Sequence, residues 1–105
     1  MISIIIPCYN EELIIQDFIY ELNESLLKID NEEFEVIFID NKSNDSTIRK
    51  IKNKLKKFNK AKLINLSNYF GKEAAILAGL DNSNGESCII MDPDLEDPPS
   101  LINQM

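Results

Sequence analysis

Short runs of apolar residues alternate along this chain with longer segments in which apolar positions recur every three or four residues. Short runs rich in branched side chains are typical of buried β-strands, and the longer spacing is typical of amphipathic helices. The predicted strands cover 3–7, 34–40, 61–67 and 87–92. The predicted helices cover 11–29, a segment with the apolar stripe Ile48, Ile51, Leu55 and Phe58, then 71–83, and the start of a further helix at 98–105.

The alternation of these strands and helices predicts an α/β fold, in which a Rossmann-like parallel sheet carries helices on both faces. The strands are almost entirely apolar, as expected for parallel strands that are covered on both sides. With 105 residues the chain is at most one domain, and its last predicted helix is cut short. We therefore interpret residues 1–105 as the N-terminal part of a larger domain.

Local signals predict where the helices begin and end. Asn10 is the expected N-cap of the first helix, with Glu11 and Glu12 in its first turn, and Gly85 is the expected C-cap glycine of the third. Cys8 and Cys88 are expected to be buried and reduced. If the first and fourth strands are neighbours, the two cysteine Cα atoms lie on the order of 13 Å apart, which is too far for a disulfide.

Composition and charge exclude several functions. The net charge of −7 argues against nucleic-acid binding, which depends on clustered lysine and arginine. The N-terminus does not resemble a signal peptide, and no run approaches the roughly 20 apolar residues that a membrane helix needs. The chain is therefore expected to be soluble and cytoplasmic. It contains no histidine, which excludes an imidazole base or metal ligand.

Polar clusters follow three of the predicted strands. They read "PCYNEE" after the first strand, "DNKSND" after the second and "DPDLED" after the fourth. Parallel sheets bind ligands beyond the carboxyl ends of their strands, at the point where the strand order reverses. We expect the three clusters to meet at this edge of the sheet.

The last of these clusters is unusually acidic. It contains Asp92, Asp94, Glu96 and Asp97. Carboxylates this close repel one another unless a cation offsets their charge, and their oxygens suit Mg²⁺ or Mn²⁺. In an extended chain Asp92 and Asp94 point to the same side and form a partial shell for a metal that also binds phosphates. The alternative is a solvated acidic turn, in which Asp97 before Pro98 caps the next helix.

Other side chains also allow two interpretations. Tyr9, at a strand end beside Pro7, either lines a pocket or packs as an ordinary aromatic residue. The basic residues between Arg49 and Lys62 form the solvated face of the second helix or a membrane-facing patch, and the apolar stripe of that helix favours the solvated face. The aromatic residues assigned to the core are Phe34, Phe38 and Phe70.

Four motifs occur together in an order and spacing that carry more weight than any one of them. They are "SIIIPCYNEE", "FIDNKSNDST", "NYFGKEAAILAGLD" and "MDPDLEDPP". In these motifs the chain resembles glycosyltransferase family 2 over essentially its whole length. Within that family it is most similar to polyprenyl-phosphate sugar transferases, such as dolichol-phosphate mannosyltransferases and bactoprenol glucosyltransferases.

The resemblance implies a fold, an activity and a cofactor. The implied fold is the A-type glycosyltransferase fold, of which this chain would supply the nucleotide-sugar-binding N-terminal part. The implied reaction is the inverting transfer of a hexose from a UDP- or GDP-sugar donor to a polyprenyl phosphate or a saccharide acceptor, with Mg²⁺ or Mn²⁺. No catalytic base is assigned, because an acceptor phosphate whose second pKa is about 6 is already ionised.

The resemblance also implies roles for individual residues. The residues that would bind the nucleotide sugar are Pro7, Tyr9, Glu11, Ile39, Asn41, Asp92 and Pro93. Asp94 and Glu96 would hold the metal on the diphosphate, with Glu96 standing where the family usually has glutamine. The segment "SNYFG" lacks an arginine that the family commonly has there, and Lys72 would partly replace it at the phosphates.

Further expectations concern regions and partners beyond these residues. The resemblance implies that the acceptor site and any membrane helices lie downstream of these residues. The chain alone is therefore expected to bind nucleotide weakly and to be inactive. Membrane association is expected through the downstream region. A sheet edge left open predicts a homodimer. The alternative function is a receiver-like signalling domain with an acidic Mg²⁺ pocket, in which a small phosphodonor would label Asp40 or Asp92.

Overall fold

The computed structural model describes residues 1–93, so the predicted helix over 98–105 and the acids Asp94, Glu96 and Asp97 lie outside the described residues. Within that part of the chain the strands are β1 (Ile2–Cys8), β2 (Phe34–Asp40), β3 (Ala61–Asn65) and β4 (Ser87–Ile90). The helices are α1 (Ile15–Leu27), α2 (Thr47–Lys54) with the short 3-10 helix η1 (Leu55–Lys57), and α3 (Lys72–Asp81).

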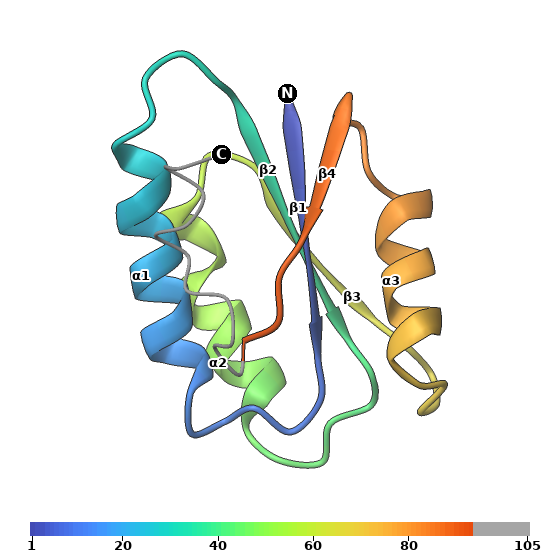
Figure 1. Ribbon diagram of the computed structural model, residues 1–105. Helices are drawn as coiled ribbons and strands as arrows, with labels where there is room; N and C mark the ends of the chain where they lie inside the picture. Colours follow the sequence, from blue (N-terminus) through green and yellow to red (C-terminus); the bar gives the residue numbers. More distant parts are fainter. Residues whose placement is uncertain (94–105) are drawn as a thin grey trace.

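The strands form one parallel sheet in the order β3-β2-β1-β4. This confirms the predicted α/β fold. The first strand pairs with the fourth, which is the arrangement assumed above for the distance between the two cysteines. In Figure 1, α1 and α2 lie on one face of the sheet and α3 lies on the other. The chain moves outward from β1 to β3 and then returns to the other side of β1, so the strand order reverses between β1 and β4.

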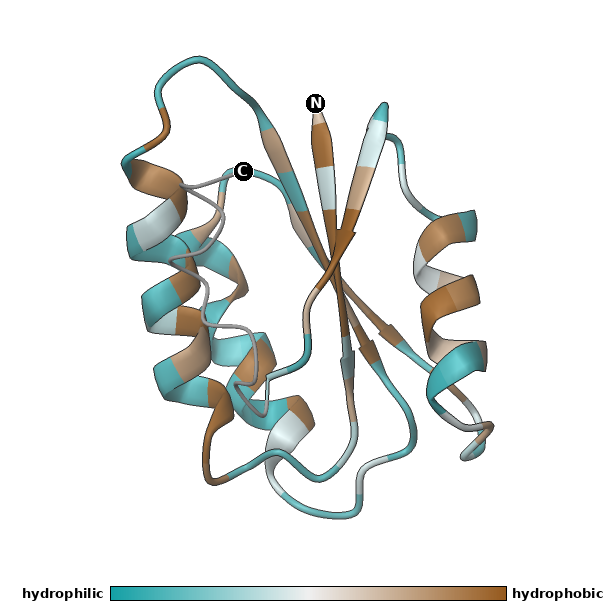
Figure 2. Ribbon diagram, viewed as in Figure 1, coloured by the Kyte–Doolittle hydropathy of each residue, from teal (hydrophilic) through white to brown (hydrophobic). Residues whose placement is uncertain are grey.

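Alternate residues of the two central strands build two separate cores. Ile4, Ile6 and Phe38 pack with α1 and α2, while Ile5 and Ile37 pack beneath α3. All five side chains are fully buried. Figure 2 shows the strands as hydrophobic where they cross the middle of the sheet. The apolar strands predicted from the sequence are therefore covered on both faces, as their composition requires.

Helix α3 lies unusually close to the sheet because its inner face carries small residues. Ala75 and Gly79 are buried there. A Cβ atom on Gly79 would lie 2.5 Å from Cγ2 of Ile5 and 2.8 Å from Cδ1 of Ile39, which is closer than carbon atoms can approach. The outer face of the same helix exposes Leu77 by 60%. Gly79 thus sets the distance between α3 and the sheet.

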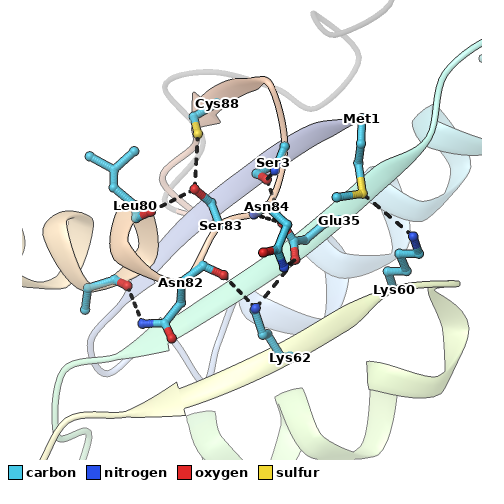
Figure 3. A network of polar contacts seen from close by, with 12 residues as sticks. Met1, Ser3, Glu35, Lys60, Lys62, Leu80, Asn82, Ser83, Asn84 and Cys88 are labelled. Atoms are coloured by element: carbon cyan, nitrogen blue, oxygen red, sulfur yellow. Dashed lines mark hydrogen bonds and ion pairs between the residues drawn. The ribbon is translucent and has the colours of Figure 1, made fainter.

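At the amino ends of the strands a buried carboxylate joins three segments (Figure 3). Glu35 on β2 accepts hydrogen bonds from the Ser3 hydroxyl at 2.6 Å and from the Asn84 backbone N–H at 2.8 Å. It also forms an ion pair with Lys62 on β3, with 3.5 Å between the nitrogen and oxygen atoms. This network attaches the connection between α3 and β4 to the first three strands.

Two of the predicted helix caps are wrong. Helix α1 begins at Ile15 rather than after Asn10, because the side-chain oxygen of Asn10 accepts a hydrogen bond from the Asn44 N–H and is not available to cap a helix. Helix α3 ends at Asp81, and its C-cap is Asn82 rather than Gly85. Gly85 instead lets the chain approach β1, since a Cβ atom there would lie 2.7 Å from the Ser3 nitrogen.

Two predictions of buried side chains are also wrong. Cys8 is buried, but Cys88 is exposed, because α3 covers β1 and β2 and leaves that side of β4 open. The two thiols are free, and the register places Cys88 opposite Ser3, at the other end of β1 from Cys8. Phe70 is 56% exposed because it lies in the connection that leads into α3, whereas Phe38 is in the core as expected.

Candidate functional site

A small cleft of about 150 Å³ lies at the carboxyl ends of the strands, where the strand order reverses between β1 and β4. Ligands of open parallel sheets bind at this position. Its lining residues are Pro7, Cys8, Tyr9, Glu11, Asn41, Tyr69, Lys72 and Asp92. They come from β1, from the connections that follow β1, β2 and β3, from the first residue of α3, and from Asp92, two residues beyond β4. The described residues of the three strand-end clusters therefore meet at one edge of the sheet.

The connections after β1 and β2 are held together by reciprocal hydrogen bonds. The Asn10 N–H donates to the Ser43 hydroxyl at 2.8 Å, and the Asn44 N–H donates to the Asn10 side chain at 3.0 Å. Ser43 is itself fixed by Asp40, whose two carboxylate oxygens accept its N–H and its hydroxyl. Asn10 and Lys42 have positive φ angles of 51° and 64°, so both loops turn sharply at the cleft.

A second set of contacts joins the same two connections through Glu11, Asp45 and Thr47. The buried Thr47 hydroxyl accepts the Glu11 N–H at 2.8 Å and donates to Asp45 at 2.5 Å. Burial alone would raise the pKa of Asp45, but hydrogen bonds from Thr47 and from the Glu12 N–H hold this pKa below its usual 3.8. Asp45 is therefore ionised at neutral pH and orders the backbone that carries Glu11.

Asn41 connects the floor of the cleft to the segment before α3. Its own N–H donates to the Cys8 carbonyl at 2.9 Å, and its side-chain oxygen accepts the Phe70 N–H at 2.9 Å. The residue is only 3% exposed. An amide can donate and accept at once, so Asn41 retains donors for a ligand while its oxygen holds the neighbouring connection.

The mouth of the cleft contains an aromatic pair and an ion pair. The rings of Tyr9 and Tyr69 lie with their centroids 4.7 Å apart at an angle of 58°. The Lys72 ammonium group, at the start of α3, forms an ion pair with the Asp92 carboxylate beyond β4. Tyr69 was not among the predicted site residues. Its signal in the sequence was its place just after a strand, in a connection that must cross the carboxyl edge of the sheet.

The cysteine in the cleft is not a nucleophile. Cys8 is 2% exposed, and burial raises the pKa of its thiol well above the usual value, as do the negative charges of Asp40, Glu11 and Asp92. The protonated thiol is a weak nucleophile and a poor metal ligand. Cys8 therefore contributes to the floor of the cleft and not to chemistry.

The predicted site residues divide into three groups. Those that line the cleft are Pro7, Tyr9, Glu11, Asn41 and Asp92. Ile39 is fully buried beneath α3, so its side chain does not reach the cleft, and Pro93 is buried just after Asp92. The predicted metal ligands Asp94 and Glu96 lie outside the described residues.

Residues 1–93 contain neither a cluster of metal ligands nor a membrane-spanning helix. In that part of the chain no three cysteine or acidic side chains are grouped so that they could hold a metal ion. No helix of the described part is long and apolar enough to cross a membrane.

Curated relatives match this chain over nearly its whole length. An uncharacterized glycosyltransferase of Synechocystis, sll0501, is 39% identical over 106 positions, which cover 99% of this chain and 32% of the relative. A prophage bactoprenol glucosyl transferase homolog of Escherichia coli is 35% identical over 102 positions, which cover 96% of this chain and 33% of the relative. The chain spans about a third of the length of the curated relatives it matches.

Solved structures share the fold. S. aureus TarS 1-349, crystallised with UDP, is 30% identical with a TM-score of 0.71, over 98% of this chain and 32% of TarS. Glucosyl-3-phosphoglycerate synthase from Mycobacterium tuberculosis, in complex with Mn²⁺, UDP and glucosyl-3-phosphoglycerate, is 23% identical with a TM-score of 0.71, over 99% of this chain and 37% of that one. The second likeness concerns the fold alone.

The family itself is defined by a match over nearly the whole sequence. The profile of glycosyl transferase family 2 covers residues 3–105. The matched region contains the sheet, the three helices and every residue of the cleft. The chain belongs to glycosyl transferase family 2.

Proposed function

We propose that this chain provides the nucleotide-sugar-binding part of a glycosyltransferase that transfers a hexose, with inversion, from a UDP- or GDP-sugar to a polyprenyl phosphate. The observation that carries the proposal is the gathering of Pro7, Tyr9, Glu11, Asn41 and Asp92 in one cleft at the reversal of strand order. Support for the donor comes from TarS, which was crystallised with UDP. Support for the acceptor comes from the Escherichia coli relative, whose name gives bactoprenol.

Within the cleft, each group has a role that fits its chemistry. Tyr9, 42% exposed, offers an aromatic face to the nucleoside, and the amide donors of Asn41 lie beside it on the cleft floor. Ile39, whose side chain is buried, would contact the base only through its backbone. Asp92 and Pro93 would lie against the donor sugar. An acceptor phosphate with a second pKa of about 6 is largely ionised at neutral pH, so the reaction needs little help from a base.

We propose Mg²⁺ or Mn²⁺ as the cofactor and Asp94 and Glu96 as its protein ligands. Carboxylate oxygens suit both ions, and these ions usually keep further positions for substrate phosphates. Bound there, the ion would stabilise the negative charge that grows on the diphosphate leaving group. The Mycobacterium tuberculosis synthase, bound to Mn²⁺ and UDP, is an example of the same fold holding both.

Two further proposals concern the whole protein. A polyprenyl-phosphate acceptor would bring it to the cytoplasmic face of a membrane, through regions other than the described helices. Self-association would involve β4, because within residues 1–93 this strand pairs on one side only, with β1, and exposes Ile90 by 45%. By itself the chain would bind nucleotide without catalysing transfer.

A receiver-like signalling function has no support in the structure. Asp40 is fully buried, and both of its carboxylate oxygens already accept hydrogen bonds from Ser43. A small phosphodonor would not reach this carboxylate, and the carboxylate of Asp92, the other predicted labelling site, is engaged in an ion pair with Lys72. The family match therefore replaces that alternative.

Isothermal titration calorimetry of the full chain tests the proposal directly. UDP and GDP are titrated with Mn²⁺ and again with EDTA, and one of the two nucleotides is expected to bind at least about tenfold more tightly with the metal. Asp94→Ala should remove most of that metal-dependent gain, whereas the matched control Asp81→Ala, at the far end of α3, should not. If neither nucleotide binds in the presence of Mn²⁺, the proposed function is wrong.

A further inference from the structure

The side chains that line the cleft carry unbalanced charge. Glu11 and Asp92 are acidic, and Lys72 is the one cationic residue among those that line the cleft in the described part of the chain. The protein as a whole has a net charge of −7. A nucleotide diphosphate that enters this cleft without a metal would therefore meet two carboxylates, and Lys72 is the group that can attract it.

In the structure that cation is already engaged by a carboxylate from the opposite side of the cleft. Lys72 begins α3, and Asp92 follows β4, so their ion pair spans the point where the strand order reverses. The Lys72 side chain is 57% exposed and that of Asp92 is 32% exposed. Ion pairs with this much solvent contact contribute little to stability, so the pair can exchange partners at small cost.

A diphosphate is a ligand that would displace the Asp92 carboxylate from Lys72. It carries more negative charge than one carboxylate and offers several oxygens to the three N–H donors of an ammonium group. Tyr9 and Asn41, proposed to hold the nucleoside, line the same cleft as Lys72, so a bound nucleotide would bring its phosphates within reach of this side chain.

We propose that Lys72 is the diphosphate-binding residue of this cleft and that Asp92 competes for it until the nucleotide arrives. This inference rests on the proposed function, because it names the group that receives the phosphates of the proposed donor. On binding, the ammonium group leaves the Asp92 carboxylate for the diphosphate, and the carboxylate becomes available to the rest of the donor.

The proposal predicts opposite effects for the two members of the pair. Calorimetry of the full chain in EDTA, with UDP or GDP and with the matching nucleoside, isolates the contribution of the phosphates from that of the metal. Lys72→Met should weaken diphosphate binding about tenfold, the size of one charge-assisted hydrogen bond, and leave nucleoside binding unchanged. Lys72→Arg should keep most of the affinity. Asp92→Asn should strengthen diphosphate binding several-fold.

A double variant and a surface control separate this mechanism from general electrostatics. In the Lys72→Met background, Asp92→Asn should change diphosphate affinity less than about twofold, because the competition it relieves is gone. Lys52→Met, on an exposed position of α2, removes the same charge and should have no effect. Thermal midpoints of all variants check that the fold is retained.

Failure of this inference and failure of the proposed function would give different results. Equal losses of nucleoside and diphosphate affinity in Lys72→Met would make Lys72 a structural residue and overturn the inference. A full gain from Asp92→Asn in the double variant would mean that Asp92 repels phosphate directly, and the competition would be wrong. If the unmodified chain binds neither nucleotide even with Mn²⁺, the proposed function itself fails.

Discussion

Thr47 has no exposed surface and uses both hydrogen-bonding capacities of its hydroxyl group. It accepts the Glu11 N–H and donates to Asp45, and thereby joins the connection after β1 to the start of α2. The sequence analysis predicted an apolar stripe of Ile48, Ile51, Leu55 and Phe58 on this segment. Ile51 is buried as expected, but the second buried residue of α2 is Thr47 and not Ile48. At the scale of single residues, the cleft depends on buried polar contacts that hydrophobic spacing does not reveal.

Thr47→Val should lower the free energy of unfolding by about 1–3 kcal/mol, because it leaves the Glu11 N–H and the Asp45 carboxylate without this partner. Thr47→Ser keeps the hydroxyl and should lose less than half as much. Urea unfolding monitored by circular dichroism measures both. Equal stability of the valine and serine variants would show that the hydroxyl does not hold the two connections together.

Acid should destabilise the folded chain through Glu35 and Asp45. Burial raises the pKa of Glu35, but hydrogen bonds from Asn84 and Ser3 and the charge of Lys62 hold it below its usual 4.5. The pKa of Asp45 likewise lies below 3.8. A carboxylate with a lowered folded pKa contributes its stabilisation fully above the unfolded pKa and loses it as the pH falls through the folded value.

The free energy of unfolding should therefore fall between about pH 5 and pH 3, as protons bind the unfolded carboxylates more readily than the folded ones. Glu35→Gln should make this decline shallower and should already be destabilising at neutral pH. Urea titrations at several pH values measure the slope. A pH-independent free energy across that interval would contradict the assignment.

At the scale of the elements, α3 differs from the other two helices. Its apolar residues surround it instead of forming one stripe, and its contact with the sheet depends on small side chains at Ala75 and Gly79. The sequence analysis predicted this helix over 71–83, close to its observed bounds. It did not identify Gly79, because a glycine within a helical pattern becomes meaningful only when Ile5 and Ile39 are known to lie opposite it.

Gly79→Val should lower the free energy of unfolding by about 1–3 kcal/mol, because the added side chain overlaps Ile5 and Ile39 and forces α3 away from the sheet. Leu77→Val, on the exposed face of the same helix, should change stability by less than about 0.5 kcal/mol. Thermal unfolding compares the two variants. A neutral Gly79→Val would show that α3 can shift outward without loss of packing.

At the scale of the whole molecule, the amino ends of the strands stabilise the fold and the carboxyl ends form the cleft. The amino ends carry the Glu35 network, which attaches the connection before β4 to the other strands (Figure 3). The carboxyl ends carry the cleft. Within residues 1–93, β4 has an unpaired edge, and on its α3 side it exposes Ile90 and Cys88. An open strand with exposed apolar residues is a surface on which a second copy can pair.

The full chain should accordingly self-associate as its concentration rises, and Ile90→Lys should shift it towards the monomer, because a lysine on an open strand opposes pairing with another strand. Leu13→Lys adds the same charge at a residue that is 90% exposed in the connection between β1 and α1, and should leave association unchanged. Sedimentation velocity at several concentrations measures the shift. Identical behaviour of the two variants would place the contact elsewhere.

The amino-acid sequence alone determined which segments of residues 1–93 form strands and that these strands run parallel, because parallel strands buried on both faces are short, apolar and separated by helices. It also determined which connections carry polar groups to the carboxyl edge of the sheet. The helix starts were less predictable. The position of α1 depends on Asn10, whose side chain binds a loop that lies more than 30 residues away in the chain.

Only the tertiary structure decided which side chains meet in the cleft. Asn41 contacts the Phe70 N–H across 29 residues, and Lys72 pairs with Asp92 across 20. Tyr9 and Tyr69 come from separate connections. Periodicity and local propensity act over a few residues, so they specify helices and strands. Contacts between distant segments arise only when the sheet brings their ends to one edge.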